Sequence, residues 1–538
     1  MANKTQTIRI ESILGGHSPT THFAAPDQFR ASFGINPSFE VTDNASSYGQ
    51  KSCGLLRPVC NRTYADGGVL SACPKWMKNN YLEDVIYVYD DRGSLSTFSL
   101  ISNTFTGISD GGNESGTASG NGAEYYDNYM YFSRNTTIAR YGPLNGTPSL
   151  NGDYWGATLG KAALTNTTYP TINSVKYPNH ILHRHSDGKL YILDVVDNQG
   201  TIHYIKTRKA TVEGDTDDGS VYAKISVGYG LYPTAIESLG DTLIIAFAEG
   251  FNPTAAGKRA PAKIAFWDTT SDKVNQITWS EYPDSFVSSI KNVNGIIHLT
   301  SANIIGAGGF RIMKYVGGSS FEELHVEDTS QLPFPGAVIA SGKRLVYGGY
   351  SYVPYASVSI KSLGLRTNLG GGAFNIYKPT TSVSFVGSIF ENSLSFPNDS
   401  FYIGYGTTSV GTLEGNQSSG GTYTYSGVSQ TWWSQTYKVG QKFKITKIRI
   451  PLAQPMATNM VVTPTFYTDD GRGRTYVGGV DSGLAIINNT NYSGKQLVTM
   501  RPENLVGESN FYLELVWSGS ALCVVGLPIT IEYELLDD

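Results

Sequence analysis

The residues whose types are best suited to chemistry include three closely spaced histidines: His180, His183 and His185. On a β-strand His183 and His185 would share a face, because side chains alternate, and imidazole is a common metal ligand. However, no carboxylate falls in register with them except Asp187, in the turn that follows. Two interpretations stay open, a metal site and histidines that pack in or on a sheet, and the second is our expectation.

A second candidate for metal binding is the acidic run Asp215, Asp217 and Asp218 before Gly219. Oxygen donors at alternating positions are typical of the first half of a calcium loop. The acidic residue that should close such a loop is missing, since Tyr222-Ala223-Lys224 follows instead. We therefore expect a solvated acidic turn, with a calcium site as the alternative, and no cofactor.

Motifs for covalent catalysis or phosphate binding are absent from the sequence. There is no Gly-x-Ser-x-Gly nucleophile motif, and no glycine-rich loop is followed by Lys-Ser or Lys-Thr. A pair of carboxylates for glycoside hydrolysis depends on spacing that only the fold sets, and the sequence singles out no such pair. The expectation is that the protein is not an enzyme.

Aromatic residues in polar surroundings offer another kind of site, because such rings stack on sugars. One segment holds Tyr350, Tyr352 and Tyr355, and another holds Trp432 and Trp433. For the tyrosines, packing between sheets is the stronger alternative. For the tryptophans, which lie between two predicted domains, we expect a contact between domains or subunits.

The four cysteines are expected to be buried free thiols. Cys53, Cys60 and Cys73 lie near the start and Cys523 near the end, but no paired C-x-x-C spacing of a zinc site is present. The first residues contain no apolar segment of a secretory signal, so export by that route is not expected.

The composition limits the elements that could position these residues. The chain has 538 residues, with 60 glycines and 35 tyrosines, which favours many short strands joined by tight turns. Its 40 basic and 45 acidic residues nearly balance, at a formal charge of −5, so we expect no nucleic-acid partner. No apolar run is long enough to span a membrane as a helix, so we expect no membrane insertion.

A hairpin pattern recurs about every 50 residues: an apolar stretch, a polar turn with Gly, Asn or Asp, then a short apolar strand. The instances begin near Leu82, Glu124, Leu182, Ile236, Ile290, Ala340 and Ile389. A repeat of this length fits one four-stranded blade, so the sequence predicts an all-β protein with a β-propeller of about seven blades. Separate sandwiches are the competing fold. The repeats carry no family signature, since only one Trp-Asp pair occurs, at Trp267-Asp268.

The two flanks differ from the repeats. Residues 1–54 read as an extended N-terminal arm, 55–411 as the propeller and 412–430 as a Gly/Ser-rich linker. Residues 431–538 contain alternating strands, such as Ile529, Ile531 and Tyr533 against Thr530 and Glu532, which predict an antiparallel β-sandwich with a jelly-roll-like topology.

Four segments resemble structural proteins of tailed bacteriophages. They are Ile10–Gly16, Gln28–Pro37, Ser52–Val59 and Val525–Glu532. The resemblance implies a non-enzymatic virion protein, at the nozzle, the tail tip or a fibre, that is assembled in the host cytoplasm. Its partners would be further copies of itself and other virion proteins. The alternatives are a module that binds or depolymerises a host-surface glycan, and a cytoplasmic propeller adaptor.

Overall fold

The structure is a computed structural model, and it describes the chain in segments. The described residues are 5–13, 15–18, 25–35, 38–41, 50–53, 55–59, 62–80, 84–108, 122–134, 136–160, 164, 171–172, 175–176, 181–196, 199–205, 221–249, 261–271, 273–303, 310–318, 320–326, 333–342, 344–351, 357–363, 373–377, 385–391, 401–407, 410–415 and 430–536. Nearly all regular structure in them is β-strand, as the composition predicts.

Seven four-stranded antiparallel sheets are found in the described residues, and each forms one blade. Blade 1 is β7 (Pro74–Lys78), β8 (Val85–Asp90), β9 (Leu95–Ser99) and β10 (Phe105–Ile108), and blade 2 is β11 (Ala123–Tyr126), β12 (Tyr129–Ser133), β13 (Ile138–Gly142) and β14 (Ser149–Asn151). Blade 3 is β17 (Ile181–Arg184), β18 (Leu190–Val196), β19 (Gln199–Ile205) and β20 (Val221–Tyr229), and blade 4 is β21 (Leu231–Leu239), β22 (Thr242–Glu249), β23 (Ala262–Trp267) and β24 (Thr278–Tyr282). Blade 5 is β25 (Phe286–Val293), β26 (Ile296–Ala302), β27 (Arg311–Gly317) and β28 (Ser320–Val326), and blade 6 is β29 (Val338–Ser341), β30 (Arg344–Ser351), β31 (Ser357–Leu363) and β32 (Ala373–Tyr377). Blade 7 is β33 (Phe385–Glu391), β34 (Phe401–Gly406), β35 (Gly411–Gly415) and β6 (Arg62–Tyr64).

Tight turns join the first two strands of several blades, because residues that tolerate a left-handed backbone stand there. Asp127 and Asn128 have φ of 45° and 66° between β11 and β12. Asn294 and Gly295 have φ of 52° and 85° between β25 and β26. Two consecutive positive φ angles are the requirement of a two-residue hairpin whose twist matches the strands.

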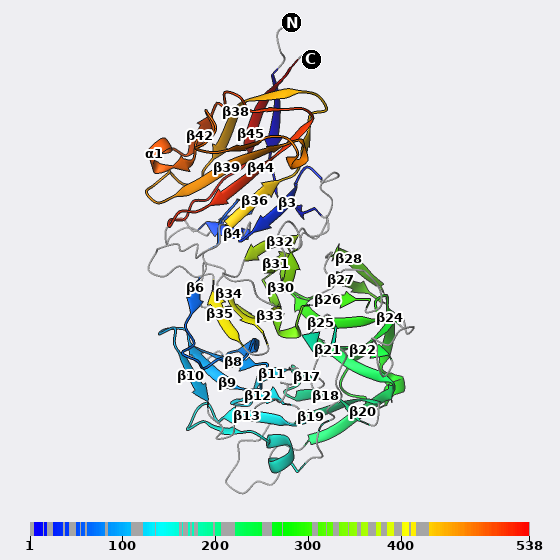
Figure 1. Ribbon diagram of the computed structural model, residues 1–538. Coiled ribbons are helices and arrows are strands. Elements are labelled where there is room, and N and C mark those ends of the chain that lie inside the picture. Colours follow the sequence, from blue (N-terminus) through cyan, green and yellow to red (C-terminus); the bar gives the residue numbers. More distant parts are fainter. Residues whose placement is uncertain are drawn as a thin grey trace.

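The blades form a closed ring, which is the arrangement of a β-propeller (Figure 1). The first strands contact one another in order, from β7 through β11, β17, β21, β25 and β29 to β33, and β33 contacts β7 again. β6 comes from before the first blade and pairs with β35 as the outermost strand of the last, so the chain closes the ring on itself. The predicted all-β propeller is therefore confirmed.

Two further sheets are built from both ends of the chain, and we call them together the two-sheet unit. One contains β1 (Thr5–Ile10), β45 (Ile529–Leu535), β38 (Phe443–Pro451) and β42 (Leu497–Met500), with β43 (Val506–Gly507) beside β38. The other contains β2 (Gly16–His17), β3 (Gln28–Phe33), β36 (Gln430–Ser434), β44 (Asn510–Trp517), β39 (Val461–Thr468) and β40 (Thr475–Val477), with β37 (Tyr437–Lys438) beside β44 and β41 (Ile487–Asn488) beside β39. The remaining elements are the hairpins β4 (Ser38–Val41) with β5 (Gln50–Cys53) and β15 (Thr171–Ile172) with β16 (Val175–Lys176), and five short helices. These are the α-helix α1 (Asn489–Tyr492), the π-helix η1 (Tyr154–Thr158) and the 3-10 helices η2 (Val274–Gln276), η3 (Pro335–Ala337) and η4 (Asp469–Gly471).

The strand pairing divides the chain differently from the domain boundaries that the sequence predicts. The predicted arm is not a separate extension: β1 pairs with β45, and β3 pairs with β36. The predicted linker also begins inside a blade, because β35 reaches Gly415. The reason is that an alternating segment reveals a strand but not its partner, which here lies hundreds of residues away in sequence.

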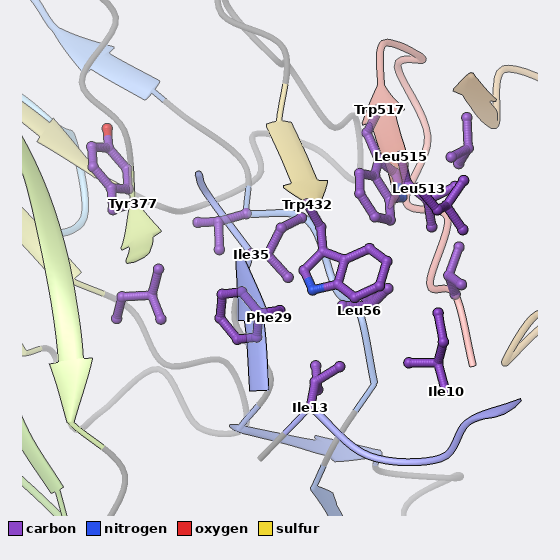
Figure 2. Close-up of a cluster of buried hydrophobic side chains, with 14 of the residues drawn as sticks. Ile10, Ile13, Phe29, Ile35, Leu56, Tyr377, Trp432, Leu513, Leu515 and Trp517 are labelled. Atoms are coloured by element: carbon purple, nitrogen blue, oxygen red, sulfur yellow. The ribbon is translucent and has the colours of Figure 1, made fainter. Parts of the chain in front are cut away.

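The two sheets share a hydrophobic core that continues into the propeller. Phe443 of β38 and Phe511 of β44 lie across the two sheets, with ring centroids 5.4 Å apart. The same cluster of buried side chains includes Phe29, Ile35 and Tyr377, the last of which belongs to β32 of blade 6. Figure 2 shows Ile35 and Phe29 between Tyr377 and Trp432, so a continuous apolar contact connects the unit to the ring.

Candidate functional site

Five polar residues stand at the same position on the first strands of five successive blades, the strands that contact one another around the ring, and we call them the axial cluster. They are Lys78, Glu124, His183, Glu237 and Lys291, on β7, β11, β17, β21 and β25. Each occupies an equivalent register position on the first strand of its blade, opposite Tyr87, Tyr131, Tyr191, Ile244 and His298 of the second strand. All five residues are partly buried, and burial lowers the pKa of two of them, His183 and Lys291.

The charges of the axial cluster act on one another across blades. Lys78 Nζ lies 3.0 Å from Glu124 Oε1, which links blades 1 and 2. Burial lowers the pKa of Lys291 on blade 5; the carboxylates of Glu237 and Glu124 oppose this shift, and the ammonium of Lys78 adds to it. Lys78, Glu124, Glu237 and Lys291 stand at the same register position of first strands that contact one another around the ring, so we infer that their charges lie around a common central space.

The two described histidines of the predicted cluster share a hydroxyl group. His183 Nε2 lies 2.7 Å and His185 Nδ1 2.8 Å from Ser238 Oγ, so they join blade 3 to blade 4. Burial lowers the pKa of His183, with Lys78 and Lys291 acting in the same direction, against Glu237 and Glu124. The arrangement thus favours a neutral imidazole at neutral pH.

Other parts of the predicted metal sites lie elsewhere. His180 and the acidic run at Asp215, Asp217 and Asp218 fall outside the described residues. Asp187 accepts hydrogen bonds from Lys189 Nζ and Tyr191 Oη, at 2.8 and 2.7 Å. Within the described segments, no group of three or more His, Cys, Asp and Glu side chains could hold a metal ion.

The polar groups of the axial cluster can offer both donors and acceptors to a ligand. Glu237 Oε1 accepts a hydrogen bond from the backbone N–H of Ser238, at 2.9 Å, and Lys291 forms no ion pair with any described residue. Apart from His183, sequence reasoning missed the members of this cluster. A signal was present, because Glu124, Glu237 and Lys291 each stand three residues before a two-residue hairpin turn.

The predicted tryptophan site lies in the two-sheet unit, and both rings are buried. Trp432 is 1% exposed and belongs to the large core cluster with Phe29 (Figure 2). Trp433 is 9% exposed and packs with Ala31 and Phe33 on the opposite face of β36. In this arrangement the described side chains use both indoles for packing, and neither presents a face for a sugar ring.

The predicted tyrosine site is only partly described. Tyr350 belongs to β30, opposite Val358 of β31. Its side chain, and the whole of Tyr352 and Tyr355, lie outside the described residues. A glycan contact by these tyrosines therefore stays a prediction.

Two of the four cysteines are described with their side chains, and both are buried free thiols: Cys73 and Cys523. Burial raises the pKa of Cys523 to about 12 and that of Cys73 well above its usual value. The side chain of Cys53 and all of Cys60 fall outside the described residues.

A buried carboxylate stabilises the closure of the ring. Glu414 of β35 is fully buried and accepts hydrogen bonds from Thr63 Oγ1 of β6, at 3.1 Å, and from Tyr377 Oη of β32, at 2.5 Å. Tyr405 Oη of β34 also donates to it. Because these hydroxyls come from two blades and from the closing strand, Glu414 connects the strands at which the ring closes.

Comparisons with known proteins add little. No protein-family model and no curated protein matches the chain. Among solved structures, it is similar to the Cps50 (Swd1) β-propeller domain of Myceliophteria thermophila, at 10% identity and a TM-score of 0.41 over 66% of this chain and 98% of that one. A second similar structure is the Pan2 WD40 domain of Neurospora crassa, at 7% identity and a TM-score of 0.41, over 65% of this chain and 90% of that one. It is also similar to Raptor of Chaetomium thermophilum, at 10% identity and a TM-score of 0.42, over 67% of this chain and 29% of that one. At these TM-scores the fold assignment rests on the strand pairing described above.

Proposed function

We propose that this protein is a non-enzymatic structural component of a tailed-phage virion. Its place would be in the tail, as part of the nozzle, the tail tip or a fibre attachment. The proposal begins from the four segments that resemble phage structural proteins, and it includes localisation in the virion after assembly in the host cytoplasm.

The observation that carries a scaffold function is the continuous core between the propeller and the two-sheet unit. Ile35 and Tyr377 are 1% and 2% exposed and belong to one cluster that spans both parts. A large apolar contact restrains the relative motion of domains, whereas polar contacts usually permit it. A rigid two-part body is what an assembly needs when geometry determines its function.

In this proposal the two-sheet unit is a β-sandwich with a jelly-roll-like topology, and it contacts neighbouring subunits. Its exposed apolar side chains include Val480, 81% exposed, and Leu497, 51% exposed. Leu497 belongs to β42, which is an edge strand of its sheet. Edge strands present unpaired backbone groups and are frequent sites of association between chains.

The test is mass photometry over a range of protein concentrations, with negative-stain imaging of the same sample. A closed oligomer of one symmetry is the expected result. Leu497→Asp and Val480→Asp should shift the oligomer toward monomer, while the matched control Ile101→Asp, at an exposed position of blade 1, should not. A strict monomer at every concentration would contradict self-assembly.

The alternative is a module that binds or depolymerises a host-surface glycan. It is favoured by the mixed donors and acceptors of the axial cluster. Oligosaccharide released from host polysaccharide would support depolymerisation, and it would contradict the non-enzymatic proposal.

A further inference from the structure

Two opposite charges on neighbouring blades stand out within the axial cluster. Glu237 of β21 and Lys291 of β25 stand at equivalent register positions, and the carboxylate favours the charged form of the lysine, yet no ion pair between them is found among the described residues. Their strands are in contact, and both side chains are half-buried. Apart from the bond between Glu237 and Ser238, no described residue uses the hydrogen-bonding capacity of the two side chains.

Hydrogen bonds from neighbouring residues fix part of the surroundings of Glu237 and Lys291. The backbone N–H of Ser238 holds Oε1 of Glu237 at 2.9 Å, which leaves the other oxygen bound to no described residue. Asn292 Nδ2 donates to the carbonyl of Ser238 at 3.0 Å and so connects β25 to β21 beside the two charges. The carboxylate and the ammonium are thus carried by adjoining, mutually bonded strands.

The charge pattern selects a class of ligand. An anion would be attracted by Lys291 but repelled by Glu237 and Glu124, and a cation would meet the reverse pattern with Lys78 and Lys291. A hydroxyl group avoids this conflict, because it donates to a carboxylate and accepts from an ammonium. Several hydroxyls on one rigid ring can satisfy both groups at once.

We propose that the axial cluster is a binding site for a neutral sugar, with Glu237 and Lys291 as its principal hydrogen-bonding residues. The Lys78–Glu124 pair provides a second carboxylate and ammonium from blades 1 and 2. This inference gives the glycan-binding alternative a specific site and ligand class, and it is independent of the proposed structural function, since the blades that carry the axial cluster lie apart from the two-sheet unit (Figure 1).

The experiment uses the full chain and defined sugars: D-glucose, D-galactose, D-mannose and N-acetyl-D-glucosamine. Saturation-transfer difference NMR detects binding, and isothermal titration calorimetry measures its Kd. At least one neutral sugar should bind with a Kd of about 1 mM or tighter. Failure of all four to bind would overturn the proposal.

Variants locate the site. Glu237→Gln keeps the acceptor for Ser238, and Lys291→Met keeps most of the side-chain volume, so both should fold; an unchanged melting temperature verifies this. Each should weaken sugar binding about tenfold or more, because each removes a hydrogen bond to a charged group. Lys263→Met, on β23, is the matched control and should bind as the wild type does. Equal binding by all three variants would overturn the assignment.

Charged probes distinguish a sugar site from an ion site. Inorganic phosphate, D-glucuronate, D-glucosamine and glycine should bind more weakly than the best neutral sugar. Tighter binding of phosphate or glucuronate would show an anion site, and tighter binding of glycine a zwitterion site; either result would overturn the proposal. Oligomeric state is measured in the same samples, so loss of sugar binding without loss of assembly separates this inference from the proposed function.

Discussion

Glu414 shows how a single buried charge can hold distant parts of the chain. Its carboxylate accepts hydrogen bonds from Thr63, Tyr377 and Tyr405. A carboxylate is stable in the interior only when hydrogen bonds replace the water that it has lost. Here those bonds come from the closing strand, from blade 6 and from blade 7 itself.

Replacing this carboxylate should destabilise the ring. We expect Glu414→Leu to lower the free energy of unfolding by about 3 kcal/mol, because the hydroxyls that it serves lose an acceptor in the interior. The measurement is urea denaturation followed by tryptophan fluorescence. The control Glu322→Leu, at a half-exposed position, should cost less than about 0.5 kcal/mol. Equal effects of the two substitutions would show that Glu414 does not stabilise the ring closure.

The buried thiol of Cys523 should make the protein less stable at alkaline pH. Burial raises its pKa to about 12, whereas an unfolded thiol ionises near pH 9. Above pH 9 the unfolded state therefore loses a proton that the folded state keeps, and stability falls as the pH rises. At pH 10 the loss should be about 1.4 kcal/mol.

The variant Cys523→Ala isolates this effect. Its own stability is lower at every pH, because a buried side chain is shortened, but its decrease between pH 8 and pH 10 should be about 1.4 kcal/mol smaller than that of the wild type. Denaturant titrations at the two pH values give the difference. An identical decrease in both proteins would mean that Cys523 ionises freely in the folded state.

At the scale of elements, local signals in the sequence predicted the hairpins. They did not predict which strands pair when the two strands are far apart in the sequence. The turns at Asp127-Asn128 and Asn294-Gly295 could be identified because two adjacent residues determine them. The partners of β1 and β6 could not, since an alternating or three-residue strand fits many edges equally well.

The same limit applies to the candidate site. Its histidines could be identified as a local group, but Ser238, which binds His183 and His185, lies more than 50 residues away in sequence. Glu237 and Lys291 become neighbours only when blades 4 and 5 are placed side by side. Residue type suggested where polar groups are, and only the ring shows which of them face one another.

The pairing of β1 with β45 predicts that the N-terminal strand is required for the two-sheet unit. Ile10 is 3% exposed and belongs to the shared core, so Ile10→Asp places an unpaired charge there and should cost about 3 kcal/mol or more. Limited proteolysis should then cleave within residues 430–536 sooner than it does in the wild type. Thr7→Lys, an exposed change on the same strand, is the control and should leave the digestion pattern unchanged. Cleavage within residues 430–536 at the wild-type rate in Ile10→Asp would contradict the requirement for the N-terminal strand.

At the scale of the whole molecule, two chain segments and a shared hydrophobic core connect the propeller to the two-sheet unit. The chain leaves the two-sheet unit before β6 and returns to it at β36, so the propeller is inserted between two halves of that unit. Leu56 pairs with Val525 and Ile35 with Pro58 along this crossing. Such a connection fixes the relative position of the parts more firmly than a single linker does, because two chain segments must move together.

This connection predicts cooperative unfolding that depends on one apolar contact. In the wild type we expect a single calorimetric transition, because the shared core couples the ring to the two-sheet unit. Ile35→Asp should split it into two transitions, since a charge between Phe29 and Tyr377 removes the coupling while each part keeps its own core (Figure 2). Ile101→Asp, at a position 77% exposed, should retain the single transition. Two transitions already present in the wild type would show that the parts unfold independently, and the rigid body on which a scaffold function depends would then have to come from a neighbouring subunit.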